Sequence, residues 1–292
     1  MLSFWPSESR TPEPQSHVAL ITGASQGLGR AFAEACARLS IDLVLVALPD
    51  SGLDRVARGL ELLYDVRVES VPMDLTRADS VETLVGRIGE TGLPVSMLIN
   101  NAGVGYNARF EESTLGENES CVLLNNLALV KLTRLLLPEL QRREQSFVLN
   151  VASLAAFFPT PYMPVYGSSK AFILNFSLAL RAEMRGTPVS VTALCPNGIR
   201  TNGEAKDKIE AHGLIGRWVS LDPEDVARTA LDGMLAQRPV IIPGLINQAL
   251  AGVGRHAPPY LVCPVVAAFY GKTSKGRDDR PVRLPKKSWS WI

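Results

Sequence analysis

Tyr166 and Lys170 are a pair of side chains that could move a proton. They are four residues apart, so on a helix they would project from the same face. A phenol ordinarily titrates near ~10, and a neighbouring ammonium group favours its ionised form. The pair could therefore exchange a proton with a substrate. Taken alone, this spacing is common by chance and usually belongs to a solvated pair on a helix surface.

A glycine-rich turn follows the first apolar run and precedes a helical pattern. Glycines allow a tight turn, and a helix N-terminus offers N–H groups and a favourable dipole to a pyrophosphate. The same residues also fit the Gly-x-Ser-x-Gly elbow of hydrolases, with Ser25 as nucleophile. That elbow needs an upstream strand loop for its oxyanion hole, and here it follows the first strand, so the hydrolase is disfavoured. Nucleotide binding and a plain tight turn stay equally open on this motif alone. The turn consists of Thr22, Gly23, Ala24, Ser25, Gln26, Gly27, Leu28 and Gly29.

Two further polar positions follow other apolar runs. Asp74 comes after the third run, and the segment Asn100–Gly103 ends the fourth. Ligands of open α/β sheets bind at the carboxyl ends of the strands, so both positions are candidates for ligand contact. The simplest alternative for Asp74 is a helix N-cap.

The elements that must position these residues alternate along the chain. Short runs that are apolar throughout are separated by segments of helical periodicity, which is typical of parallel strands covered on both faces. The sequence predicts an α/β fold, a single doubly wound parallel sheet of about seven strands. The predicted strands are Val18–Thr22, Leu43–Leu48, Val66–Met73, Val95–Ile99, Phe147–Val151, Val189–Leu194 and Val240–Ile242.

The combination of motifs resembles the short-chain dehydrogenase/reductase family over about residues 17–243. The spacings from Asn126 to Ser153 (27 residues) and from Ser153 to Tyr166 are similar to those of the family. Pro243-Gly244, followed by apolar helices, also resembles a bacterial subgroup of unassigned reductases. The motifs that carry the resemblance are the glycine turn, Asp74-Leu75, Asn100–Gly103, Asn126, Ser153, Tyr166, Lys170 and a segment from Pro196 to Thr201.

The resemblance implies a Rossmann-like fold and an enzyme that transfers hydride between NAD(P)(H) and a carbonyl or secondary alcohol. It implies a catalytic tetrad of Asn126, Ser153, Tyr166 and Lys170, in which Asn126 fixes a water beside the lysine. Asn125 is adjacent, and a mid-helix asparagine satisfied by backbone is the plainer interpretation. The alternative function is a nucleotide-sensing or scaffold protein on the same fold that has no catalytic activity. The implied cofactor-binding residues are Gly23, Ser25, Gln26, Gly27, Leu28, Gly29, Asp74, Leu75, Asn101, Ala102, Gly103, Tyr166, Lys170, Ile199 and Thr201.

Cofactor choice is weakly determined by the sequence. Selectivity between NAD and NADP is set just after the second strand, beside the adenosine ribose. Ala47 and Leu48 occupy the positions where relatives carry an acidic residue or an arginine, and the nearest charged residues are Asp50 and Arg55. We expect weak discrimination with a slight preference for NADP. The usual Pro-Gly pair is replaced by Pro196-Asn197, and Asn tolerates a left-handed turn.

The predicted substrate is a small hydrophobic carbonyl or alcohol, such as a ketone, a steroid-like ring or an acyl chain. The segment between Ser153 and Tyr166, where the family builds its pocket wall, is apolar and partly aromatic. The alternative is that these side chains only pack the loop down. They are Leu154, Phe157, Phe158, Pro159, Pro161, Tyr162 and Met163.

The remaining expectations concern partners and domains. The apolar helix over 162–186 predicts a homo-oligomer, a dimer or tetramer. Net charge of +1 argues against nucleic acid, scattered His and Cys argue against a metal site, and four dispersed cysteines favour the cytoplasm. No stretch reaches the roughly 18 apolar residues of a membrane span. The predicted segments are a flexible leader (1–16), the catalytic domain (17–243), a helical extension (244–271) and a basic tail (272–292), solvated or in weak contact with a membrane surface.

Overall fold

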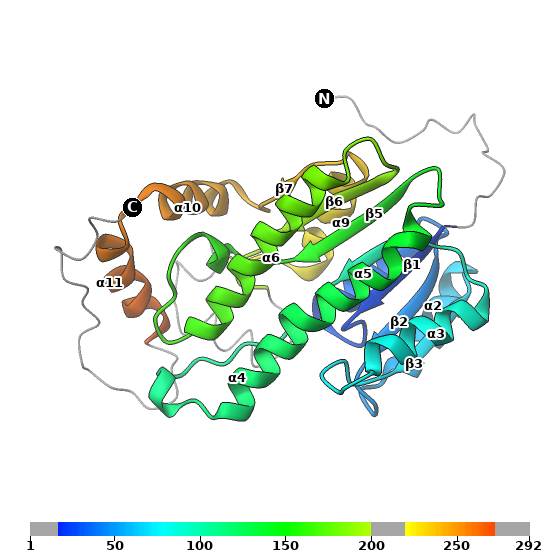
Figure 1. Cartoon of the computed structure of the whole chain (residues 1–292), viewed down its shortest axis with the longest axis horizontal. Coiled ribbons are helices and arrows are strands. Elements are labelled where there is room, and N and C mark those ends of the chain that lie inside the picture. Colours follow the sequence, from blue (N-terminus) through cyan, green and yellow to red (C-terminus); the bar gives the residue numbers. More distant parts are fainter. Residues whose placement is uncertain (1–16, 200–219, 272–292) are drawn as a thin grey trace.

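A computed structural model describes residues 17–199 and 220–271 of the chain. The predicted leader (1–16), the basic tail (272–292) and Thr201 lie outside the described residues. The described chain forms one α/β unit whose central sheet is covered by helices on both faces (Figure 1).

The seven-stranded parallel sheet predicted from the apolar runs is confirmed. Its order is β3-β2-β1-β4-β5-β6-β7, and every neighbouring pair is parallel. The order reverses direction between β1 and β4, which is where ligands bind in open α/β sheets. The strands are β1 (Val18–Thr22), β2 (Asp42–Ala47), β3 (Val68–Pro72), β4 (Val95–Asn100), β5 (Ser146–Val151), β6 (Val189–Leu194) and β7 (Val240–Ile241).

Two helix layers bury the two faces of the sheet. On one face pack α1 (Gly27–Ala37), α2 (Leu53–Tyr64) and α9 (Pro223–Leu235). On the other pack α3 (Ser80–Thr91), α5 (Leu129–Leu140) and α6 (Pro164–Glu183). Strands β1, β4, β5 and β6 are buried along their whole length, because both faces carry apolar side chains.

The helix before β5 contains a π-helical segment. α4 (Leu115–Val122) continues through η2 (Leu123–Ala128), which has π-helical hydrogen bonding, into α5. The whole run, Leu115–Leu140, is long and apolar enough by composition to cross a membrane, which the sequence reasoning missed. Leu132, Leu136 and Leu140 are at most 3% exposed and pack against the sheet, so this is a core helix of the domain.

Two helices follow β7 and lie against the loop before α6. They are α10 (Leu245–His256) and α11 (Pro259–Tyr270). Gly254 of α10 lies so close to the Phe158 ring that a β-carbon would overlap it. Asn107 donates a hydrogen bond from Nδ2 to the Tyr270 carbonyl at the end of α11 (3.2 Å). The short 3-10 helices η1 (Phe110–Glu112) and η3 (Leu154–Phe157) flank this region.

Candidate active site

The glycine turn joins β1 to α1 with backbone geometry that only glycine adopts easily. Gly23 and Gly27 have φ values of +68° and +55°. A methyl group at Gly29 would overlap the Gly23 carbonyl oxygen, so the turn and the first helical turn are in direct contact. The sequence therefore folds this way because three glycines permit a turn that a side chain would block.

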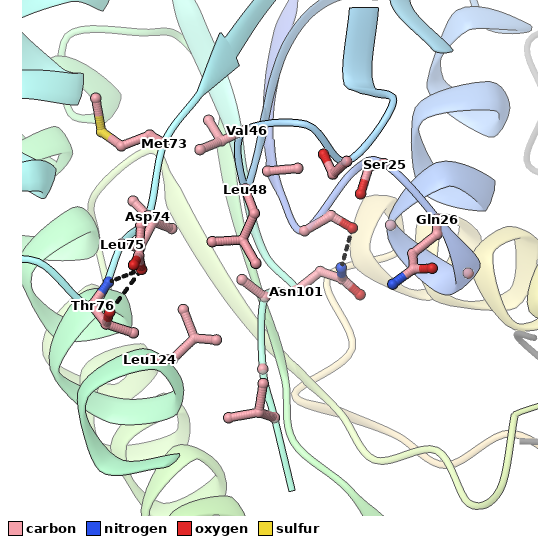
Figure 2. A pocket seen from close by; sticks show the side chains of 18 of the residues that line it. Ser25, Gln26, Val46, Leu48, Met73, Asp74, Leu75, Thr76, Asn101 and Leu124 are labelled. Atoms are coloured by element: carbon pink, nitrogen blue, oxygen red, sulfur yellow. Dashed lines mark hydrogen bonds between the residues drawn. The ribbon is translucent and has the colours of Figure 1, made fainter. Parts of the chain in front are cut away.

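A cleft of about 510 Å³ opens over this turn at the carboxyl edge of the sheet. Figure 2 shows the side chains of Leu48, Asp74, Asn101 and Leu124 around it. The structure brings together most of the residues that the sequence assigned to the cofactor, and it adds Thr76, Val104 and Leu124, which sequence reasoning missed. Those that line the cleft are Gly23, Ser25, Gln26, Gly27, Leu28, Gly29, Asp74, Leu75, Asn101, Ala102 and Gly103.

The buried Thr22 hydroxyl ties the glycine turn to the end of β4. Its Oγ1 accepts hydrogen bonds from the backbone N–H groups of Asn101 (3.0 Å) and Ala102 (2.9 Å). The Asn101 side chain donates back to the Thr22 carbonyl at 2.8 Å. The two halves of the cleft are therefore held together by side chains of the β1 and β4 ends rather than by packing alone.

Asp74 holds the turn after β3. Its Oδ1 accepts from the N–H (2.9 Å) and the hydroxyl (2.7 Å) of Thr76 (Figure 2). The N-cap of α3 is Asp79, so the alternative that Asp74 caps this helix is wrong. The turn places the Asp74 carboxylate on the cleft wall.

The cleft fits a nucleotide cofactor at its phosphate end. α1 begins at Gly27 with no acidic residue in its first turn, and Gln26 makes no capping side-chain hydrogen bond. The first-turn N–H groups are thus available to an anionic group approaching the glycine turn. Among the described residues there is no group of His, Cys, Asp and Glu that could hold a metal ion.

The wall after β2 carries no charge. Val46, Ala47, Leu48 and Ser51 line the cleft there. Asp50 and Arg55, which the sequence analysis considered as readers of the ribose, are not among the lining residues. No charged side chain therefore lines the cleft in this wall.

The proton-transfer pair lies where β5 meets α6. Tyr166 and Lys170 are in the first two turns of α6, and the Lys170 Nζ is 5.7 Å from the centre of the Tyr166 ring. Lys170 is 4% exposed and donates from Nζ to the Val151 carbonyl at 2.9 Å. Ser153, at the N-cap of η3, accepts from the Ala155 N–H at 3.2 Å. The structure thus brings these three predicted residues together.

Burial controls the pKa values of the pair. Burial raises the pKa of Tyr166, and a hydrogen-bond interaction with Ser153 opposes this rise. Burial is the largest influence on Tyr166 in the polypeptide alone, so the expected lowering of its pKa by Lys170 and a bound nicotinamide stays a prediction. Burial also lowers the pKa of Lys170 to about 8, since the charged amine loses solvation.

Asn125, and not Asn126, lies beside the lysine. The Asn125 side chain is 1% exposed, accepts from the Val104 N–H, and donates to the Val104 carbonyl and the Ser169 hydroxyl, each at 2.9 Å. A β-carbon placed on Gly103 would be 3.0 Å from Asn125 Oδ1 and 3.3 Å from Lys170 Nζ. Asn125 Oδ1 and Lys170 Nζ are therefore both close to the position that a Gly103 side chain would occupy.

Asn126 has a different role from the one expected. Its Nδ2 donates to the Ser169 carbonyl at 2.9 Å, and its side chain is partly exposed. The contacts of the two side chains therefore favour Asn125 over the predicted Asn126 as the asparagine near Lys170. The spacing from Ser153 could not separate two adjacent asparagines within a π-helical segment, where each residue is displaced from its α-helical position.

The apolar wall between Ser153 and Tyr166 meets the C-terminal helices. Leu154 is 2% exposed and belongs to the core, as the packing alternative predicted. Phe158 packs against α10, and a β-carbon at Gly271 would contact the Tyr162 ring. Tyr270 is near enough to Tyr166 to interact with it electrostatically. The extension after β7 therefore contributes to the substrate side of the site, which sequence reasoning did not foresee.

The end of β6 is described only in part. Ile199 pairs with Leu221 in an isolated parallel bridge, and Asn197 donates from Nδ2 to Asn247 Oδ1 at 3.0 Å. Ile199 does not line the cleft as described, and Thr201 lies outside the described residues.

Comparisons with known proteins agree with this geometry. The model of the short chain dehydrogenase family matches residues 17–211. Ketoacyl reductase HetN from Nostoc sp. is 33% identical over 198 residues, which are 68% of this chain and 69% of the relative. Other curated relatives are named very-long-chain 3-oxoacyl-CoA reductase or 17-beta-hydroxysteroid dehydrogenase type 3, and the match spans 53 to 60% of their length.

Solved structures show the same fold. A short-chain dehydrogenase from Sphingobium yanoikuyae in complex with NADPH has 30% identity and a TM-score of 0.70, covering 82% of this chain and 96% of its own. A short-chain dehydrogenase/reductase from Burkholderia phymatum in complex with NAD has 26% identity and a TM-score of 0.73, covering 83% and 94%. The chain belongs to the short-chain dehydrogenase/reductase family, and it is an oxidoreductase that uses a nicotinamide nucleotide.

Proposed function

We propose that this enzyme transfers hydride between NAD(P)(H) and a carbonyl or secondary alcohol on a hydrophobic substrate, and that the substrate is an acyl chain bearing a ketone. The observation that carries the proposal is that Lys170 lies beside Gly103 of the nucleotide cleft, while Tyr166, on the same helix, lines a second hollow with Tyr162 and Met163 of the apolar segment. The names of the relatives, ketoacyl and 3-oxoacyl-CoA reductases, support an acyl ketone over a steroid-like ring.

Ser153, Tyr166 and Lys170 have different roles in the proposed proton transfer. Ser153 donates a hydrogen bond to the substrate oxygen and holds it beside the Tyr166 hydroxyl. Tyr166 gives its proton to that oxygen as the carbonyl is reduced. Lys170 favours the phenolate that remains, and because its pKa is about 8 it can pass a proton to the tyrosine near neutral pH. When bound, the nicotinamide nucleotide supplies or accepts the hydride.

Asn125 positions this machinery through Ser169. Its amide donates to the Ser169 hydroxyl (2.9 Å), which in turn donates to the Tyr166 carbonyl at 2.7 Å. These two successive hydrogen bonds hold the first turn of α6, from which Tyr166 projects. The alternative of a hydrolase using Ser25 lacks a base in the described part of the chain, where His17 contacts Ser96 and His256 ends α10.

The nucleotide would be held by the cleft residues already described, with Asp74 near the adenine end and Lys170 near the ribose. We propose a slight preference for NADP and discrimination below about 100-fold, or ~2.7 kcal/mol, because the wall after β2 is uncharged. A kcat/KM ratio of about ten thousand between the two cofactors would contradict this. A reducing compartment, the cytoplasm, fits the four described cysteines, which are all buried thiols.

The proposed activity is tested by following nicotinamide absorbance with NADPH and NADH. We expect kcat/KM for 3-oxoacyl thioesters to rise with chain length, because each added methylene buries apolar surface. Tyr166→Phe keeps the ring packing and removes the hydroxyl, so kcat should fall by ~10²–10⁴ with nucleotide binding retained. Near-normal turnover of Tyr166→Phe, or no reduction of any acyl ketone, would overturn the proposal.

A further inference from the structure

The C-terminal helices carry apolar faces that nothing in the described chain covers. In α10 and α11 six of the outward side chains are large and apolar, with exposed fractions between 41 and 82%. They recur at helical spacing, so each helix presents one continuous apolar stripe. The inward positions, by contrast, are small or polar and buried: Asn247, Ala251, Cys263 and Ala267. The stripes consist of Leu245, Ile246, Leu250 and Val253 on α10 and Leu261 and Val265 on α11.

Charge is distributed unevenly between these helices with their tail and the rest of the chain. Residues 244–292 hold eight of the 30 Lys and Arg and two of the 29 Asp and Glu, a net charge of +6. The remaining residues hold 22 basic and 27 acidic side chains, a net charge of −5. α11 itself has no charged residue, and the only charged or titratable side chains of α10, Arg255 and His256, are in its last turn. Seven of these eight basic residues follow α11 in the sequence, and an apolar surface joined to such a segment favours an anionic lipid surface.

We propose that the outer faces of α10 and α11 bind the surface of an anionic phospholipid bilayer, with the adjoining basic residues attracted to its headgroups. A second copy of the chain is the less favourable occupant. Residues 244–292 have a net charge of +6 in each copy, and like charges repel. No charge opposes insertion along α11, so its stripe can enter the boundary between headgroups and acyl chains.

The inner faces of the same helices give this contact a role in substrate access. Gly254 packs on Phe158, Gly271 lies beside Tyr162, and Tyr270 interacts with Tyr166. The exposed apolar stripes and these inner contacts therefore belong to different faces of α10 and α11. This role rests on the proposed function, whereas the bilayer contact does not. A hydrophobic acyl ketone dissolved in the bilayer would reach the apolar wall between Ser153 and Tyr166 without crossing water.

Vesicle flotation with the full chain tests the bilayer contact. Wild type should float with phosphatidylcholine vesicles that contain phosphatidylglycerol and much less with pure phosphatidylcholine, and added salt should weaken the binding. The double variant Val253→Glu, Val265→Glu should bind at least about tenfold less, because two apolar side chains no longer enter the lipid. The matched control is Leu62→Glu, which alters an 87% exposed leucine on α2 and should bind as wild type does.

Several outcomes would overturn the proposal. They are failure of wild type to float with the anionic vesicles, undiminished binding by the double variant, and equal loss in Leu62→Glu. A double variant that changes the sedimentation of the free protein from dimer to monomer would assign the face to a second copy. Circular dichroism verifies folding, and Val265→Ser, a milder change, should lower binding in the same direction. Tyr166→Phe should still bind vesicles, so failure of the proposed reaction and failure of the bilayer contact are distinguishable.

Discussion

Burial of Lys170 affects both the chemistry and the stability of the protein. Its ammonium group has one backbone acceptor, the Val151 carbonyl, and little solvent. Placing a charged amine there costs free energy, and the pKa of about 8 expresses this cost. Burial of Lys170 therefore lowers the free energy of unfolding, but it keeps a proton donor close to Tyr166.

This cost predicts how stability changes with pH. Below pH of about 8 the lysine is protonated in both the folded and the unfolded state, and the full cost applies. Between about 8 and the ordinary 10.5 the folded state releases its proton first, so stability rises with pH. We expect the free energy of unfolding of wild type, relative to Lys170→Met, to rise by up to about 3 kcal/mol over this range.

Urea unfolding of both proteins at a series of pH values measures this difference. Comparing the two proteins cancels other groups that titrate at alkaline pH and do not interact with Lys170, such as Cys36. Burial raises the pKa of the Cys36 thiol to about 12, and this shift makes stability fall with rising pH, which is the opposite sign. A difference that does not change with pH would show that Lys170 has its ordinary pKa.

The two adjacent asparagines give a second prediction at this scale. Asn125→Ala should lower the free energy of unfolding by about 1–3 kcal/mol, because Val104 and Ser169 lose buried partners. It should also lower kcat at least about tenfold while nucleotide affinity changes little, since Tyr166 is positioned through Ser169. Asn126→Ala is the matched control and should cost much less. Equal kinetic losses in both variants would restore Asn126 as an equal candidate.

At the scale of elements, the first turn of α1 depends on a glycine that has no room for a side chain. Gly29→Ala places a methyl group against the Gly23 carbonyl oxygen, so the turn must shift. We expect nucleotide affinity to fall by at least about tenfold and stability to fall by about 1–3 kcal/mol, as for other overpacked sites. Calorimetric titration with NADPH and thermal unfolding measure the two effects.

Gly59→Ala is the control for this prediction. Gly59 is inside α2, and nothing lies within 4 Å of a β-carbon added there. The change should stabilise the protein by about 0.5–1 kcal/mol, because alanine favours the helix. Unchanged nucleotide affinity in Gly29→Ala would mean that the turn adapts and that its glycine is not required.

The sequence predicted the elements well where a single local signal determines them. The strands are apolar throughout because both faces are covered, and β1 and β6 have the predicted bounds. β3 is shorter than its apolar run, and β7 has only two residues, because pairing depends on the neighbouring strand. The π-helical segment has no composition signal of its own, so the sequence could not separate Asn125 from Asn126.

The nucleotide half of the site was equally accessible to sequence reasoning. Carboxyl ends of parallel strands meet at one edge, so Gly23, Asp74 and Asn101 had to converge. The substrate half depends on contacts between distant parts of the chain, such as Gly254 with Phe158 and Asn107 with Tyr270. No periodicity or motif encodes such contacts, because they form only when distant parts of the chain fold together.

At the scale of the whole molecule, α6 and the helix beside it leave an apolar surface exposed. One side of α6 packs on the sheet through Ile173 and Leu174, as its apolar composition predicted. The other side exposes Phe172 (46%), with Leu127 and Leu135 exposed on the neighbouring helix. Exposed large side chains on adjacent helices favour a two-fold interface between copies.

We expect wild type to be a dimer or tetramer at micromolar concentration and Phe172→Glu to be a monomer. A buried carboxylate without a partner would oppose association, while the monomer fold should be unaffected because the side chain is half exposed. Sedimentation velocity measures the state of each. Leu63→Glu, at a 74% exposed position on α2, is the control and should sediment as wild type does. A monomeric wild type would contradict the prediction.

The π-helical segment Leu123–Ala128 has a consequence for chain length. A π-helical turn holds one residue more than an α-helical turn, so the helix contains one extra residue here. Deleting Leu127 would allow regular α-helical hydrogen bonding from α4 into α5. The same deletion would rotate α4 by about 100° about its axis relative to α5, since each residue advances an α-helix by that angle. Cys121 and its neighbours would then turn away from Ser169 and the loop at Val104. The shortened chain would form the more regular helix but could not fit around Lys170, so the residue count of this helix is set by the site and not by the helix.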